Sequence, residues 1–280
     1  MKLARCTDGT EVFWARIDTD EATATRLDEP WSTWAPRLTA DPGAGVALRD
    51  DIRDLDRIRL LPPAEPTARV VAAGATYAKH VAGLGLKMPE RPAAFLKPYS
   101  SLLAPGDDIA YPPVTSQLDY EVELVAVLGA PVRGVTQPIH AVLGYTVGND
   151  VSARDLQFGG SVTGMDMFSA KALDDTCGLG PWIVTRDEFG DDHPDLELRL
   201  EVDGELRQHD RTSSMVWGVA ELLTYVDDRM ALRSGDVLMT GTPAGVGHEN
   251  GAFLRPGQLV EASIEALGTL QNRVAVRKAD

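Results

Sequence analysis

The sequence has only two cysteines, Cys6 and Cys177, and no apolar run long enough to cross a bilayer. Two cysteines are too few for a disulfide framework and are typical of a reducing compartment. A membrane-spanning helix needs about 20 consecutive apolar residues. The first eight residues also lack the apolar core of a signal peptide. We therefore expect a soluble, cytoplasmic protein with no membrane partner.

Positive charge is scarce: the sequence has 27 Lys and Arg residues but 42 Asp and Glu residues, so its net charge is −15. An acidic chain of this kind is not expected to bind the phosphate backbone of nucleic acids. It also repels small dianions at long range, so an anionic substrate must be captured by local cations. The candidates are a metal ion, Lys171 and Arg154. At 280 residues, one main domain with a small appendage is expected.

Two glutamates, Glu121 and Glu123, interrupt an otherwise apolar stretch at residues 119–128. Side chains alternate along a strand, so both carboxylates point to one face, about 7 Å apart along the chain. Burying two like charges on one face is costly unless a cation compensates them. An edge strand with one solvated face is the alternative interpretation. Residues 125–128 are apolar on both faces, which favours a covered strand and a metal site.

A third carboxylate, Asp150, follows a short predicted strand at Gly144–Val147. Together with Glu121 and Glu123 it would form a site made only of oxygen ligands. Such ligands suit Mg²⁺, Mn²⁺ or Ca²⁺ better than zinc or copper. Alternatively, Asp150 caps a helical turn at residues 153–158. Beside the two glutamates, we favour the metal ligand.

A proline-rich connector at Leu61–Pro66 is expected to form a stiff, extended link. It divides the chain into a small N-terminal domain, residues 1–66, and a larger domain, residues 67–280. Short strands and polar turns alternate before the connector. After it, strands are predicted at 69–73, 93–97, 119–128, 143–149, 181–185, 196–202, 205–209, 236–240, 258–265 and 269–277.

One long helix is predicted at residues 213–226, capped by Ser213 or Ser214. Val202–Gly204 is a hairpin signal between two alternating runs. Residues 74–91 carry four glycines or prolines and are a candidate mobile lid. Irregular strands interrupted by glycine favour a β-rich α+β fold over a series of βαβ units. The glycine-rich run at 240–247 lacks the Gly-Lys-Ser/Thr ending of a phosphate loop, which argues against a nucleotide site.

Seven stretches, in order and at these spacings, resemble the fumarylacetoacetate hydrolase family over about Val70 to Arg277. The resemblance implies a β-roll core with short flanking helices, usually assembled as a homodimer. The stretches are ATYAKH, FLKP, DYEVELVAVLG, GYTVGNDVSARDLQ, AKALDDTCGLGPWIVT, VDGELRQ and LMTGTPAGVG.

The resemblance also implies roles for individual residues. His80 matches the family's water-activating histidine, whose orienting glutamate would stand at Gly83 in this sequence. Glu90 and Glu249 are the candidate replacements. The substrate would be bound by Gln157, Thr242 and the loop that carries Tyr77.

Lys171 matches the lysine that stabilises a developing oxyanion in the family, although pairing with Asp174 or Asp175 is the commoner situation for such a lysine. Arg154 is expected either to bind a carboxylate or to pair internally with Asp155 or Asp150.

The carboxylate cluster and the family resemblance together imply a divalent-metal-dependent hydrolase that cleaves a C–C bond in a small anionic 2-oxo acid with a second carbonyl, such as an acylpyruvate. Mg²⁺ or Mn²⁺ would hold the substrate as a metal-bound enolate forms, and Ca²⁺ could take the site in crystals. An alternative reaction at the same site is decarboxylation of an oxaloacetate-type acid or isomerisation of a hydroxymuconate-type acid. A non-catalytic binding protein is a third interpretation, but it would not need this set of residues.

Overall fold

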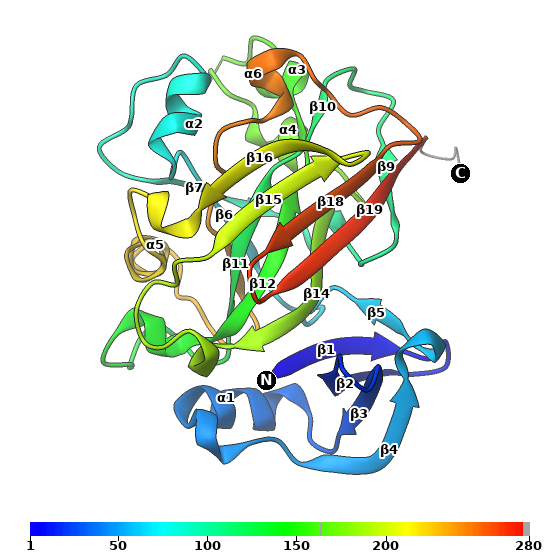
Figure 1. The fold of residues 1–280 in the computed structure, drawn as a ribbon. Helices are drawn as coiled ribbons and strands as arrows, with labels where there is room; N and C mark the ends of the chain where they lie inside the picture. Colours follow the sequence, from blue (N-terminus) through cyan, green and yellow to red (C-terminus); the bar gives the residue numbers. More distant parts are fainter. Residues whose placement is uncertain (163, 277–280) are drawn as a thin grey trace.

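The computed structural model describes residues 1–162 and 164–276, and within them two large sheets pack against each other (Figure 1). The larger sheet runs from the N-terminal strands through the centre of the molecule. In spatial order its strands are β4 (Leu48–Asp54), β3 (Thr23–Leu27), β2 (Val12–Asp18), β1 (Lys2–Thr7), β14 (Cys177–Thr185), β12 (Val142–Asp150), β11 (Val122–Leu128), β17 (Val237–Met239), β6 (Val70–Gly74) and β7 (Ala93–Lys97), with β5 (Arg59–Leu61) beside β1 and β8 (Leu102–Leu103) beside β14.

The second sheet covers one face of the first. A short two-stranded ladder and short α-helices lie around the two sheets, and most of these helices gather at one end of the sheets (Figure 1). The second sheet contains β16 (Glu205–Arg211), β15 (Glu197–Val202), β18 (Leu259–Ile264), β19 (Gly268–Val276) and β9 (Asp108–Tyr111); the ladder is β10 (Leu118–Asp119) with β13 (Ser152–Ala153); the helices are α1 (Trp31–Ala40), α2 (Ala78–Gly83), α3 (Arg154–Gln157), α4 (Met167–Lys171), α5 (Val219–Asp227) and α6 (Gly247–Asn250).

The central strand β11 is buried on both faces. Leu124 belongs to the core between the two sheets, together with Leu198 of the second sheet. Val125, on the opposite face, belongs to a second core that includes Leu3 and Trp34 of the N-terminal region. A strand covered on both sides cannot solvate the carboxylates that it carries, so the edge-strand alternative for Glu121 and Glu123 is wrong.

The β-rich α+β class is confirmed, and most predicted strands are present with shifted ends. The predicted strand 119–128 is broken at Tyr120–Glu121 into β10 and β11. Strand β12 continues through Asp150, beyond the predicted strand ends at residues 147 and 149. The hairpin at Val202–Gly204 is confirmed, with positive φ at Asp203 and Gly204. The predicted strand 269–277 matches β19 as far as Val276, and its last residue lies outside the described residues.

The predicted helix 213–226 begins too early. The helix α5 starts at Val219, and its N-cap is Gly218 rather than Ser213 or Ser214. Thr212–Ser214 form a separate 3-10 turn. After it, Met215 and Val216 are held out of the helix, because Val216 N–H donates to Thr76 O and Met215 forms a bridge with Tyr77. Long-range hydrogen bonds therefore override the local helical pattern.

The N-terminal region contains an unpredicted helix, α1, which includes Pro36. Its strands continue the main sheet, because β1 pairs with β14 at Lys2–Val184 and Leu3–Ile183. A division of the chain at residue 66 stays a prediction. Cys6 and Cys177 are buried and free, as expected for a chain without a disulfide framework.

No helix in the described part of the chain is long and apolar enough to span a membrane.

Candidate active site

Antiparallel pairing of β11 with β12 brings three acidic side chains together. Glu123 lies opposite Gly148 in the ladder, and Asp150 is the last residue of β12. The Asp150 N–H donates to the Glu121 carbonyl at 2.9 Å, which fixes the broken end of β11 beside the end of β12. One carboxylate oxygen from each of Glu121, Glu123 and Asp150 lies within 4.8 Å of the others, and all three residues are buried.

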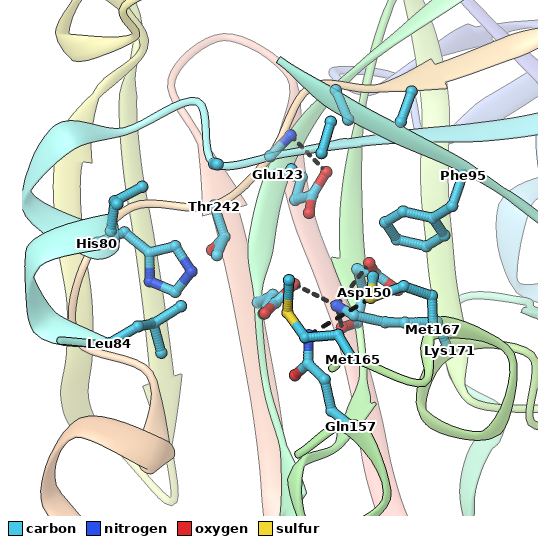
Figure 2. A pocket seen from close by; sticks show the side chains of 18 of the residues that line it. His80, Leu84, Phe95, Glu123, Asp150, Gln157, Met165, Met167, Lys171 and Thr242 are labelled. Atoms are coloured by element: carbon cyan, nitrogen blue, oxygen red, sulfur yellow. Dashed lines mark hydrogen bonds and ion pairs between the residues drawn. The ribbon is translucent and has the colours of Figure 1, made fainter. Parts of the chain in front are cut away.

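Buried cations neutralise two of these carboxylates. Lys171 Nζ lies 2.6 Å from Glu121 Oε2 and 2.8 Å from Asp150 Oδ2 (Figure 2). Lys97 Nζ lies 2.6 Å from the other Asp150 oxygen. Asp150 is therefore paired on both oxygens and does not cap a helix, since the residue that precedes α3 is Ala153.

Lys171 and Arg154 do not form the ion pairs with acids close in sequence that were considered as alternatives. Lys171 pairs with Glu121 and Asp150 rather than with Asp174 or Asp175. Arg154 pairs through Nε with Asp119 Oδ2 at 2.8 Å and through Nη2 with Glu121, so its expected pairing with Asp155 or Asp150 is wrong. Asp155 instead accepts hydrogen bonds from Thr115 and Ser116.

Glu123 differs from the other two acids because no cation pairs with it among the described residues. The hydrogen bond it accepts comes from Gly241 N–H, at 2.8 Å. Burial, and then the charges of Asp150 and Glu121, raise the pKa of the Glu123 carboxyl well above its usual value. Burial also opposes ionisation of Glu121, but Lys171 and Arg154 outweigh it and lower the pKa of Glu121 to about 2.

A divalent cation bound here would neutralise Glu123, the buried carboxylate that has no cationic partner of its own in the described part of the chain. The donor set is oxygen only, which suits Mg²⁺ or Mn²⁺. The three residues therefore fit a divalent metal ion.

The Gly241 amide reaches Glu123 because residue 241 lacks a side chain. Its φ is +92°, and an added Cβ would lie 2.1 Å from Thr76 Oγ1. Only glycine allows the chain after β17 to pass this close to the acidic cluster.

His80 faces the acidic cluster from helix α2, across the pocket (Figure 2). Its Nδ1 lies 3.4 Å from Glu249 Oε1, and Glu249 is carried by α6. The second oxygen of Glu249 accepts Gly245 N–H at 3.0 Å, which fixes the carboxylate. Of the two candidate acids, Glu249 is the one beside His80, whereas Glu90 is exposed.

The glycine at position 83 leaves room for the carboxylate beside His80 to come from α6. A Cβ at residue 83 would lie 2.6 Å from Glu249 Cδ, so the Glu249 carboxylate occupies the space next to Gly83. An acid on α2 and an acid on α6 would compete for one position beside His80.

Two of the three predicted substrate-binding residues line the pocket. Gln157 accepts a hydrogen bond from Arg154 Nη1 at 2.8 Å. Thr242 accepts from Gln208 Nε2 at 2.8 Å and donates to Val122 O at 2.9 Å. Tyr77 is buried just before α2 and is not among the described residues that line the pocket.

The sequence alone did not assign roles to Lys97 and Asp119, although both stand in the motifs FLKP and DYEVELV. Each is buried and each pairs with a residue far away in the chain. A lysine that follows three apolar residues, as in Ala94-Phe95-Leu96-Lys97, was the available signal, because a buried lysine needs an acidic partner.

The protein is β-rich, and its pocket contains a buried acidic cluster that fits a divalent metal ion. A His–Glu pair lies on the opposite side of the same pocket. The chain belongs to the fumarylacetoacetate hydrolase family, because the family model described as fumarylacetoacetate (FAA) hydrolase C-terminal matches residues 69–275.

Solved structures and a curated relative agree with this membership. A 2-hydroxyhepta-2,4-diene-1,7-dioate isomerase from Mycobacterium marinum is 35% identical with a TM-score of 0.80, covering 100% of both chains. A fumarylpyruvate hydrolase from Pseudomonas aeruginosa, in complex with Mn²⁺ and pyruvate, is 34% identical with a TM-score of 0.67, covering 75% of this chain and 90% of that one. A mitochondrial oxaloacetate tautomerase from Bos taurus is 38% identical over 78% of this chain and 69% of its own length.

Proposed function

We propose that the protein is a divalent-metal-dependent hydrolase that cleaves the C–C bond of an acylpyruvate-type 2-oxo acid. The observation that carries the proposal is the pair of His80 and Glu249, which faces the acidic cluster across one pocket. Hydrolysis needs a base that activates water opposite the cluster, whereas decarboxylation driven by an electron sink needs the cluster alone.

Glu121, Glu123 and Asp150 would hold the metal ion, with Mg²⁺ or Mn²⁺ as the candidates. When bound, the ion supplies a fixed positive charge that polarises the 2-oxo carbonyl and stabilises negative charge on it. The Mn²⁺ in the fumarylpyruvate hydrolase relative supports a divalent ion of this class.

His80 would take a proton from water, and Glu249 would hold the imidazole for that task. A carboxylate on Nδ1 favours the tautomer with hydrogen on Nδ1, leaving Nε2 free to accept the proton. Hydroxide then adds to the distal carbonyl carbon, and the bond between that carbon and C3 of the pyruvate unit breaks. The electron pair remains on the pyruvate unit as an enolate, which takes up a proton to give pyruvate.

Lys171 and Gln157 would bind the oxygens of the reacting substrate. Lys171 Nζ is buried at the floor of the pocket, and its pKa is raised because Asp150 and Glu121 outweigh the effect of burial. Its charge is therefore available to stabilise an oxyanion. Gln157 has its side-chain oxygen bound to Arg154, and its amide nitrogen donates to Met167 Sδ at 3.7 Å, a weak contact that a substrate oxygen would replace.

A decarboxylase, tautomerase or isomerase at the same site is the second candidate. The isomerase from M. marinum, similar over the whole length, and the oxaloacetate tautomerase of B. taurus support it. These reactions also form an enolate, but they need no attacking water.

A substrate panel separates the candidates. The purified protein is supplied with Mg²⁺ or Mn²⁺ and given acetylpyruvate, fumarylpyruvate, oxaloacetate or a hydroxymuconate-type dienedioate. We expect release of pyruvate together with a second acid from an acylpyruvate, detected by chromatography. Turnover of oxaloacetate or the dienedioate alone, with no acylpyruvate cleaved, contradicts the hydrolase assignment.

A further inference from the structure

The pocket has a charged floor and an apolar mouth. The floor consists of the acidic cluster with Lys171 and Arg154. Toward solvent, at the mouth, the lining changes to Leu84 and Leu86 after α2 and Met165 before α4, and Leu86 and Met165 are exposed. Figure 2 shows Leu84 and Met165 among the side chains that line the pocket. A substrate whose 2-oxo acid end lies on the floor must place its distal acyl group among these side chains.

Phe95 marks the border between the two parts. Its ring on β7 lies 5.9 Å from Lys171 Nζ, and Figure 2 shows it on the wall of the pocket opposite His80. An aromatic face at this position favours contact with a flat or apolar group over contact with a carboxylate.

The mouth also lacks a cation for a second carboxylate. Of the described residues that line the pocket, only His80, Arg154 and Lys171 have basic side chains. Arg154 and Lys171 both belong to the floor, where they contact the acidic cluster, and Lys171 is assigned there to the reacting oxygens of the substrate, so neither serves the mouth.

His80 offers no better partner to a distal carboxylate. It lies beside the Glu249 carboxylate, which repels a second anion. The net charge of −15 adds long-range repulsion of a dianionic substrate.

We infer that the distal acyl group of the substrate is uncharged and apolar, either alkyl or aryl, so that the substrate is a monoanion. The inference rests on the proposed function. It sets this chain apart from the substrates named for two relatives, since fumarylpyruvate and 2-hydroxyhepta-2,4-diene-1,7-dioate each carry a second carboxylate. Burying an unpaired carboxylate among Leu84, Leu86 and Met165 is unfavourable, whereas an alkyl or aryl group gains from leaving water.

A matched pair of substrates tests the inference. Butanoylpyruvate and succinylpyruvate differ by the terminal carboxylate, and kcat/KM for pyruvate release is measured for each with the Mn²⁺-loaded enzyme. We expect kcat/KM to be at least about tenfold higher for butanoylpyruvate. Equal values, or a preference for succinylpyruvate, overturn the inference and leave the hydrolase assignment standing. Failure to release pyruvate from either compound overturns both.

A positive charge placed at the mouth should reduce or abolish the preference for the uncharged acyl group. Leu86 is 49% exposed, so Leu86→Arg is expected to fold and to supply the missing cation. We expect this variant to raise the succinylpyruvate-to-butanoylpyruvate ratio of kcat/KM by about tenfold or more.

Two control variants isolate the position and the charge. Leu96→Arg adds the same charge on β7 at a residue that is 57% exposed and is not among the lining residues. Leu86→Gln changes the same residue without adding charge. Leu96→Arg is expected to keep the wild-type ratio, and Leu86→Gln to change it much less than Leu86→Arg does. An equal change of the ratio in Leu86→Arg and Leu96→Arg shows that net charge, and not the mouth of the pocket, sets the preference, and this contradicts the inference.

Discussion

Glu123 is the acidic residue of the cluster whose charge the described part of the protein does not balance. It is buried in the central strand, next to two other carboxylates, and no cation pairs with it among the described residues. Glu121 and Asp150 have Lys171, Arg154 and Lys97 as partners. Without a bound cation, Glu123 therefore costs folding free energy when ionised.

Replacing Glu123 with alanine should abolish metal binding while the protein stays folded. The variant loses a ligand and also loses charge repulsion, so we expect its metal affinity by calorimetry to fall at least about hundredfold. Glu21→Ala, at an exposed turn, removes the same charge elsewhere and is the control. Mg²⁺ or Mn²⁺ affinity that is unchanged in Glu123→Ala contradicts the three-carboxylate site.

The same variant has a predicted effect on stability without metal. The pKa of Glu123 is raised in the folded state, so its protonation stabilises the fold at low pH, and that contribution is lost as pH rises through the raised pKa. At neutral pH, we expect metal-free Glu123→Ala to melt at the same temperature as the wild type or higher.

The acidic cluster was predictable from local sequence, but its counter-charges were not. Two glutamates one residue apart in an apolar run are expected to share a face by strand geometry. Although the strand is broken at Tyr120–Glu121, both carboxylates lie beside Asp150. The partners of Arg154 come from residues 33 and 35 positions away, and Lys97 reaches Asp150 across 53 positions. Such contacts depend on sheet order, which the local pattern does not contain.

Among the elements, α2 and α6 together make the proposed catalytic base. Helix α2 carries His80, and α6 carries Glu249, 169 residues away. The missing glutamate at Gly83 was visible in the sequence. Which of the two candidate acids takes its place depended on how the two helices pack.

Among the secondary-structure elements, the helices were predicted least well from the sequence. The apolar spacing before Val219 is helical, but Val216 is bound to the strand-like segment at Thr76. In the N-terminal region, where only strands and turns were predicted, α1 forms although it includes Pro36, a residue that disfavours helix interiors.

Gly83→Ala should weaken hydrolysis by moving Glu249. The added Cβ would lie 2.6 Å from Glu249 Cδ, so the carboxylate must leave its place beside His80. We expect kcat for acylpyruvate hydrolysis to fall about tenfold or more, with metal affinity unchanged. Glu90→Ala, which removes the exposed candidate acid, should have no effect.

An acid exchange between the helices gives the reciprocal test. Glu249→Ala should lose hydrolysis, and adding Gly83→Glu in that background should restore part of it from α2. Gly83→Glu alone should not help, because two side chains would compete for one place. A double variant no more active than Glu249→Ala would show that the acid does not act through His80.

At the scale of the whole molecule, the N-terminal region and the catalytic region share one core. Trp34 is fully buried and belongs to the same apolar cluster as Val125 and Leu179 of the central sheet. Trp34 also stacks edge-on with Trp14 and Trp31. The homodimer implied by the family resemblance stays a prediction.

Trp34→Ala should therefore destabilise the catalytic region as well as the N-terminal one. Loss of a large buried side chain costs about 3–5 kcal/mol. We expect calorimetry to show a single unfolding transition in both wild type and variant, shifted to lower temperature in the variant. A separate early transition, with the melting of the metal-binding region unchanged, would show that residues 1–66 fold independently.

The measurement that tests the account most directly compares two activities in His80→Ala. The variant removes the proposed base and leaves Glu121, Glu123, Asp150 and Lys171 in place. Acylpyruvate hydrolysis should then fall roughly 10²–10⁴-fold, the usual contribution of a positioned general base. Metal-dependent decarboxylation of oxaloacetate, if the wild type catalyses it, should fall much less, because it needs no attacking water. Hydrolysis that survives the substitution within about threefold, with metal bound as in the wild type, would contradict water activation by His80 and with it the proposed mechanism.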